Sequence, residues 1–172
     1  MLEPDTVFRG DTKAPAQKTP PLELTILFPC LNEEEAVGES VEKALRELEK
    51  HGISGEILVV DNNSTDASAR VAANAGARVV LEPIRGYGRA LRRGLLESRG
   101  EYVLLLDADG TYPVECVPDF LSRLRGGADL VMGNRFSGRM HPDAMPLLNR
   151  VFGNPVLSWW TRTLFSVPVE DV

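Results

Sequence analysis

From residue 22 onward, short apolar runs alternate with segments that carry helix-capping residues or repeat apolar residues at helical spacing. The apolar runs predict five strands, at residues 24–29, 55–61, 77–83, 101–110 and 128–135. The segments between them predict helices at residues 32–52, 64–76, 86–100 and 113–127. Strands that are apolar throughout and alternate with helices are typical of a mostly parallel sheet covered by helices on both faces. The pattern therefore predicts an α/β, Rossmann-like fold.

Particular residues predict where these elements begin and end. Asn32 can cap the first helix, three glutamates favour its amino-terminal turn, and Gly52 can end it. The run Tyr102–Leu106 predicts a strand that is buried on both faces. Pro118 is expected to shorten or bend the helix in which it lies. These boundaries matter because ligands of parallel sheets bind just beyond the carboxyl ends of the strands.

The two ends of the chain differ from the alternating pattern. Residues 1–21 are rich in Pro, Lys, Thr and Asp without periodicity, which predicts a flexible tail ahead of one domain at 22–172. Within that domain, residues 140–172 predict amphipathic helices. Core packing is the simpler interpretation of their apolar faces, and contact with a membrane surface is the alternative, because Trp159 and Trp160 suit the headgroup boundary. The chain ends without a tail-like composition, so we expect it to be truncated at its carboxyl terminus.

Composition narrows the class of protein. Hydrophobic residues make up 43% and charged residues 26% of the 172 residues, which is a globular balance. The net charge of −6 offers no broad surface for nucleic acid, although five arginines between positions 85 and 99 form either a local anion site or a solvated helix face. Two cysteines without a signal peptide favour a cytoplasmic location, and no apolar run approaches the roughly 18 to 20 residues of a membrane-spanning helix. The composition indicates no oligomeric state.

Acidic residues lie at the carboxyl ends of two of the predicted strands, and a polar loop lies at the end of another. Asp61 ends one strand, Asp107 and Asp109 lie at the carboxyl end of a second, and the segment 29–33 lies at the end of the first. Neighbouring carboxylates repel each other unless one takes a proton or a cation lies between them. Because the two histidines of the chain lie far apart, we expect an oxygen-ligated ion such as Mg²⁺ or Mn²⁺. The alternative is that Asp107 only begins a turn, and the convergence of acidic residues at one end of the sheet weakens it.

Two further patterns admit other interpretations. The glycine-rich segment 86–94 is similar to a dinucleotide-binding fingerprint, but its third glycine is misplaced and it follows the third strand. We expect its glycines to form a tight turn into a helix whose amino end can attract phosphate. The Asp-x-Asp-Gly-Thr pattern at 107–111 also occurs in phosphatases of the haloacid-dehalogenase type. Those enzymes place it on the first strand and need a later lysine, whereas no lysine follows Lys50 here.

Five motifs occur in a familiar order: FPCLNEE, VVDNNSTD, GYGRALRRG, YVLLLDADGTYP and GNRFSG. Together they resemble family-2 glycosyltransferases of the GT-A type, which bind nucleotide sugars. Within that family, the chain is most similar to enzymes that make polyprenyl-phosphate sugars, such as dolichyl-phosphate mannose or glucose synthases. The resemblance covers residues 22–172 and implies the GT-A fold.

The resemblance also implies roles for residues that bind the donor. Pro29, Asn32 and Glu33 match the loop that lines the nucleoside pocket, and Asp61 matches an aspartate that contacts the nucleobase. Asp107 matches the first member of the Asp-x-Asp pair. In the family this pair holds Mg²⁺ or Mn²⁺ against the diphosphate of the donor.

Catalytic roles are implied for Asp109, Arg135 and Asp171. Asp109 is the second member of the metal-binding pair, and Arg135 matches an arginine that holds phosphate, with a surface salt bridge as its alternative role. Asp171 matches an acidic residue near the reaction centre, but the Cys-Gly-Phe-Arg-like stretch that follows it in the family is missing here.

The implied reaction transfers a hexose from UDP-glucose or GDP-mannose to a polyprenyl phosphate, with inversion, at the cytoplasmic face of a membrane. Two alternatives remain open. One is a family-2 enzyme with a saccharide or soluble acceptor, and the other is a non-catalytic module that binds nucleotide sugars.

Overall fold

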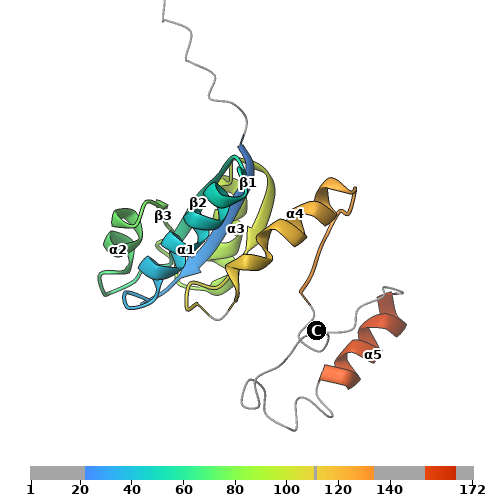
Figure 1. Cartoon of the computed structure of the whole chain (residues 1–172). Helices are drawn as coiled ribbons and strands as arrows, with labels where there is room; N and C mark the ends of the chain where they lie inside the picture. Colours follow the sequence, from blue (N-terminus) through green and yellow to red (C-terminus); the bar gives the residue numbers. More distant parts are fainter. Residues whose placement is uncertain (1–21, 111, 134–153, 166–172) are drawn as a thin grey trace, which may run out of the picture. The chain divides into compact units, whose positions relative to one another are not determined.

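The computed structural model describes residues 22–110, 112–133 and 154–165 (Figure 1). The chain divides into two compact units, Met1–Gly126 and Gly127–Val172. The first unit contains the complete sheet described below.

This sheet has four strands in the order β3-β2-β1-β4, and every neighbouring pair is parallel. The strands are β1 (Leu22–Cys30), β2 (Gly55–Asp61), β3 (Arg78–Leu81) and β4 (Gly100–Leu105). Their register places Cys30 beside Asp61, and Asp61 beside Leu81, at the carboxyl ends of the strands. The predicted parallel α/β sheet is confirmed.

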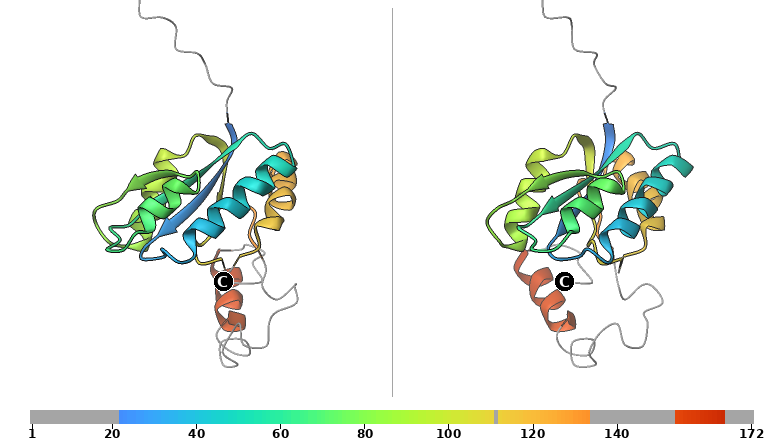
Figure 2. Two further views of the ribbon diagram at one scale, coloured as in Figure 1. Left: turned by 60° about the vertical axis from the view of Figure 1, so that its left-hand side comes forward. Right: turned by 90° about the vertical axis from the view of Figure 1, so that its left-hand side faces the viewer.

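Helices cover both faces of the sheet (Figure 2). They are α1 (Val37–Lys50), α2 (Ser68–Asn74), α3 (Tyr87–Glu97) and α4 (Val117–Arg125), with a short 3₁₀ helix, η1 (Val114–Cys116), before α4. Buried side chains of α1, α2 and α4 form the larger core with alternate residues of the strands, including Ile26, Phe28 and Val59.

The opposite face has a smaller core, made by Leu27, Leu58 and Val60 with Ala90 of α3. Gly94 permits this packing, because a β-carbon at that position would collide with the side chain of Leu27. The helix backbone therefore lies directly on β1, which positions the amino end of α3 close to the carboxyl end of that strand.

The order of the strands also predicts where a ligand binds. From β1 the chain adds β2 and then β3 on one side, and β4 then pairs on the other side of β1. In open α/β sheets, such a reversal of strand order leaves a crevice at the carboxyl ends of the strands, and ligands bind there. Here the crevice is expected between β1 and β4.

Two predictions near this crevice are wrong, one on a helix boundary and one on the burial of a strand. The first helix begins at Val37 rather than at Asn32. Asn32 adopts a left-handed conformation (φ 59°), and its side chain accepts a hydrogen bond from the loop that follows β2 instead of capping the helix. The strand β4 is not buried on both faces, since it forms an edge of the sheet and Leu105 is 43% exposed. Pro118 lies in the first turn of α4, just after η1, so the expected shortening of that helix is confirmed.

The described residues of the second unit differ from the prediction in one respect. The fifth strand is wrong over residues 128–133, which form no strand, and the rest of that run lies outside the described residues. Apolar runs become strands only where a neighbour supplies hydrogen bonds, and here Leu130 and Met132 remain exposed. The unit also contains α5 (Asn154–Phe165), on which Trp159 and Trp160 are exposed. None of the described helices combines the length and apolar character that crossing a bilayer requires.

Candidate active site

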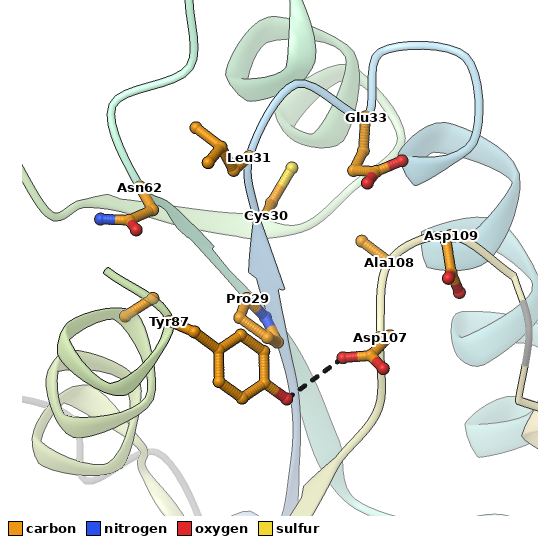
Figure 3. A pocket seen from close by; sticks show the side chains of 10 residues that line it. Pro29, Cys30, Leu31, Glu33, Asn62, Tyr87, Asp107, Ala108 and Asp109 are labelled. Atoms are coloured by element: carbon orange, nitrogen blue, oxygen red, sulfur yellow. Dashed lines mark hydrogen bonds between the residues drawn. The ribbon is translucent and has the colours of Figure 1, made fainter. Parts of the chain in front are cut away.

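A cavity of about 200 Å³ opens at the carboxyl ends of β1 and β4, at the crevice expected from the strand order (Figure 3). Its lining comes from four separate segments: Pro29, Cys30, Leu31 and Glu33; Asn62; Tyr87 and Ala90; and Asp107, Ala108 and Asp109. Four of the residues singled out from the sequence, Pro29, Glu33, Asp107 and Asp109, therefore line one cavity.

The two aspartates lie on a turn that begins where β4 ends. The backbone N–H of Leu106 still donates to the Leu27 carbonyl at 3.1 Å, so the turn starts beside β1. The carbonyl of Ala108, between the two aspartates, accepts a buried hydrogen bond of 2.9 Å from the Ser40 hydroxyl on α1. Gly110 then takes a left-handed conformation, with φ at 76°. The turn is therefore fixed from α1 through its backbone. The Asp107 carboxylate points across the cavity toward Tyr87, and Asp109 also contributes to the lining.

Tyr87 lies on the opposite wall, at the first position of α3. Its hydroxyl donates a hydrogen bond of 3.3 Å to Oδ1 of Asp107 across the cavity (Figure 3). Partial burial and the neighbouring Asp107 carboxylate raise the pKa of Tyr87, so its phenol remains a hydrogen-bond donor at neutral pH. Reasoning from the sequence missed Tyr87, although an aromatic residue between two glycines at the start of a helix is a visible signal.

Asn62 holds the loop that leads to Tyr87, and it was also missed. Its side chain is buried, and Nδ2 donates to the carbonyls of Glu82 at 3.2 Å and Ile84 at 2.9 Å. Oδ1 accepts the N–H of Gly86 at 2.7 Å. One amide thus fixes the loop between β3 and α3, and with it the position of Tyr87. The sequence suggested only helix capping for the segment that follows β2.

The loop after β1 is joined to the loop after β2 by reciprocal hydrogen bonds. Oδ1 of Asn32 accepts the N–H of Thr65 at 2.8 Å, and the N–H of Asn32 donates to the Ser64 hydroxyl at 3.0 Å. The N–H of Glu33 donates to the Ser68 hydroxyl at 2.8 Å, which directs the Glu33 side chain to the cavity. Asn32 itself is exposed and lies beside the cavity rather than in its lining.

Asp61 occupies the last position of β2 and is only 5% exposed. Its Oδ1 is buried and accepts no hydrogen bond from the described residues. A buried acceptor without a partner destabilises a fold, so it needs an explanation such as a bound ligand. The neighbouring thiol of Cys30 is protonated at neutral pH, because burial raises its pKa to about 11 and the Asp61 carboxylate adds to that rise.

Comparison with known proteins identifies the family. The profile of Glycosyl transferase family 2 matches residues 25–167. The chain belongs to glycosyl transferase family 2. The family predicted from the five sequence motifs is therefore confirmed.

Two relatives in Haloferax volcanii illustrate the range of this family. A low-salt glycan biosynthesis hexosyltransferase is 37% identical over 149 residues, which are 86% of this chain and 36% of the relative. A dolichyl-phosphate hexose transferase is 32% identical over 149 residues, which are 87% of this chain and 62% of the relative. This family-2 chain thus spans between about a third and two thirds of the lengths of these relatives.

A solved structure shares the fold. Glucosyl-3-phosphoglycerate synthase from Mycobacterium tuberculosis, in complex with Mn²⁺, UDP-glucose and phosphoglyceric acid, superposes with a TM-score of 0.52 and 29% identity. The match covers 60% of this chain and 39% of the synthase. Together with the parallel sheet, this similarity confirms the predicted GT-A fold.

Whether this family-2 domain can bind a metal ion depends on which side chains in the cavity are available as metal ligands. In the described part of the chain, no three His, Cys, Asp or Glu side chains are grouped to hold a metal ion. Mg²⁺ is commonly bound through one or two carboxylates, with substrate phosphates and waters as the remaining ligands. Asp107 and Asp109, on one turn and in one cavity, fit an ion that binds together with a diphosphate. Arg135 and Asp171 lie outside the described residues.

Proposed function

We propose that this domain transfers a hexose from a nucleotide-sugar donor, UDP-glucose or GDP-mannose, to a polyprenyl-phosphate acceptor. The transfer proceeds with inversion and uses Mg²⁺ or Mn²⁺. The proposal depends above all on one observation: Asp107 and Asp109 share a cavity with Pro29 and Glu33 at the point where the strand order reverses. A crevice at this position suits a nucleotide ligand.

The nucleoside would bind along the loops that follow β1 and β2. Pro29, Asn32 and Glu33 would shape this pocket, and the hydrogen bonds between the two loops support a preformed wall. The unpartnered oxygen of Asp61 is suited to accept a hydrogen bond from a nucleobase N–H. A buried acceptor gains more from such a bond than an exposed one, because it lacks water as an alternative partner.

The diphosphate and the acceptor would bind at the other side of the cavity. Asp107 and Asp109 would hold the metal ion. When the ion is bound, its charge would stabilise the leaving nucleoside diphosphate. Arg135 would hold the acceptor phosphate, since a planar guanidinium suits paired oxyanions. A phosphate oxygen is already nucleophilic near neutral pH, so Asp171, which matches an acidic residue near the reaction centre of the family, would contribute little as a general base.

The polyprenyl-phosphate acceptor is supported by the 32% identical dolichyl-phosphate hexose transferase of Haloferax volcanii. Exposed Trp159 and Trp160 on α5 would suit contact with a membrane surface, at its cytoplasmic face. A soluble acceptor that carries a phosphate is the second candidate. The similarity to a synthase crystallised with phosphoglyceric acid favours it.

Calorimetry tests the donor and the metal together. The protein is titrated with UDP-glucose and with GDP-mannose, each with and without Mn²⁺, and we expect one of them to bind in a metal-dependent manner. Asp109→Asn should abolish this binding and leave the fold intact, because the amide lacks the charge that the ion requires. Asp119→Asn, an equivalent change at an exposed position on α4, is the matched control. Metal-independent binding, or unchanged affinity in Asp109→Asn, would contradict the proposal.

The acceptor is tested separately by transfer of labelled hexose from the donor that binds. Polyprenyl phosphate in detergent and 3-phosphoglycerate in buffer are offered in parallel reactions. Transfer to the lipid alone supports the first candidate. Transfer to phosphoglycerate alone supports the second.

A further inference from the structure

We propose that Tyr87 is a positioning residue, which orients the Asp107 carboxylate so that Oδ2 faces the metal ion while Oδ1 is held by the tyrosine hydroxyl. This inference rests on the proposed function, since it assigns a partner to one of the proposed metal ligands. The observation behind it is the 3.3 Å hydrogen bond that joins the two walls of the cavity (Figure 3).

The structure fixes the backbone of Tyr87, and the hydroxyl of this residue donates its hydrogen bond to Asp107. The ring is 58% exposed, so it contributes little to the core. Its backbone, however, follows directly on a loop that the buried amide of Asn62 holds through three hydrogen bonds. The α3 helix that begins at Tyr87 lies directly on β1 through the close approach of Gly94 to Leu27. The backbone that carries the tyrosine is therefore rigid, so its side chain has to adopt a suitable rotamer to reach Asp107.

Asp107, in contrast, has little else to orient it. It lies beyond the end of β4, and its carboxylate accepts no hydrogen bond from the described residues other than the one from Tyr87. Ser40 fixes the backbone of the turn at Ala108 but leaves the side chain of Asp107 free to rotate. Without Tyr87, this carboxylate would populate several rotamers, and a metal ion would have to select one of them at an entropic cost.

Hydrogen bonds to metal-binding carboxylates have a known effect. They orient the ligand before the ion arrives, and losing one weakens metal binding by about 10- to 100-fold. A competing role for Tyr87 is direct contact with the donor diphosphate, because its hydroxyl also lines the cavity. The two roles differ in one measurable respect. A positioning defect is overcome by excess metal, whereas a lost contact with phosphate is not.

The test measures Mn²⁺ binding directly, by electron paramagnetic resonance of the free ion, in the full chain with saturating UDP and, in a second series, GDP. Tyr87→Phe should weaken Mn²⁺ binding by about 10- to 100-fold. At saturating Mn²⁺, its affinity for the same nucleotide should equal that of the wild type. Tyr102→Phe removes the same hydroxyl group from β4, outside the cavity, and should leave both affinities unchanged.

Three other results would overturn the inference. If Tyr87→Phe binds Mn²⁺ as the wild type does, Tyr87 does not position Asp107. If the variant binds nucleotide more weakly even at saturating Mn²⁺, Tyr87 contacts the diphosphate instead. If the wild type binds no Mn²⁺ with either nucleotide, the proposed function fails, and this inference fails with it. The first two results leave the proposed function intact, so the two failures are distinguishable.

Discussion

The two ends of the strands use acidic residues in opposite ways. At the amino-terminal ends, carboxylates have arginine partners: Glu56 accepts hydrogen bonds of 2.8 and 2.9 Å from Arg78, and Glu23 pairs with Arg125 at 2.7 Å. At the carboxyl-terminal ends, Asp61 and Asp107 have no ion pair with the described residues. The fold neutralises its acidic side chains where they only stabilise it. At the end where the proposed cation would bind, Asp61 and Asp107 have no such arginine partner among the described residues.

The amino-terminal network joins several elements. Besides Arg78, Glu56 accepts hydrogen bonds of 3.1 Å from the hydroxyl of Thr25 on β1 and from the backbone N–H of Arg99, just before β4. Thr25 in turn accepts the N–H of Gly100 at 2.9 Å. Strands β1, β2 and β3 and the start of β4 therefore meet at one partly buried carboxylate, and its contribution should be to stability alone.

The largest expected effect comes from breaking this network. Arg78→Met keeps an apolar side chain of similar length, but it leaves the partly buried Glu56 carboxylate without its charged partner. Hydrogen bonds to charged groups contribute about 1.5 to 3 kcal/mol, so the free energy of unfolding should fall by about 2 kcal/mol. Urea denaturation measures this fall. Donor binding should be unchanged, because the network lies at the opposite end of the strands from the cavity.

Arg46→Met is the matched control for that variant. Arg46 is exposed and pairs with Glu42 on the surface of α1 at 3.5 Å. Exposed pairs of this kind contribute about 0.3 to 0.5 kcal/mol, so its loss should be barely detectable. Equal losses in the two variants would show that the amino-terminal network has no special role in stability.

A smaller effect, of opposite sign, is expected at the carboxyl-terminal end. Asp61→Asn removes a buried charge whose Oδ1 has no partner among the described residues, and it keeps the shape of the side chain. Stability should rise by about 1 kcal/mol, since burying a neutral amide costs less than burying a charged carboxylate. Donor binding should weaken, because the neutral amide oxygen is a weaker acceptor for a nucleobase N–H than a carboxylate oxygen. A variant that is less stable and binds the donor as tightly as the wild type would contradict the comparison.

The sequence predicted the elements of the fold better than their boundaries. Strand β2 occupies the residues predicted for it, because its apolar run has clear ends at Gly55 and Asp61. The start of α1 was wrong because Asn32 bonds to Thr65, 33 positions away, and no local pattern signals that contact. The strand predicted at residues 128–135 failed over its described part, 128–133, for a related reason, since pairing depends on a neighbour that an apolar run alone does not provide.

In the candidate site, too, residues with a local sequence signal could be predicted, and residues whose roles depend on distant contacts could not. Asp107 and Asp109 could be predicted because a paired carboxylate after an apolar strand is a local signal. The roles of Asn62 and Tyr87 could not, because they depend on partners 20 to 24 positions away along the chain, even though the glycines around Tyr87 marked its position. Burial of Asn62 and the closeness of Tyr87 to Asp107 exist only after the sheet and α3 have packed.

The smallest expected effect is on the pH dependence of the amino-terminal network. Burial alone would raise the pKa of Glu56, but the hydrogen bonds and charge of Arg78, with the N–H of Arg99, outweigh it and hold this pKa below its usual value of 4.5. A lowered pKa in the folded state means that the pair contributes fully above pH 4.5 and loses its contribution as the pH falls through the folded-state value. The difference in stability between the wild type and Arg78→Met should therefore be constant from pH 7 to about 5 and narrow below 4.5. Urea denaturation at a series of pH values measures this difference, and one that stayed constant to pH 3 would show that protonation of Glu56 is not linked to folding.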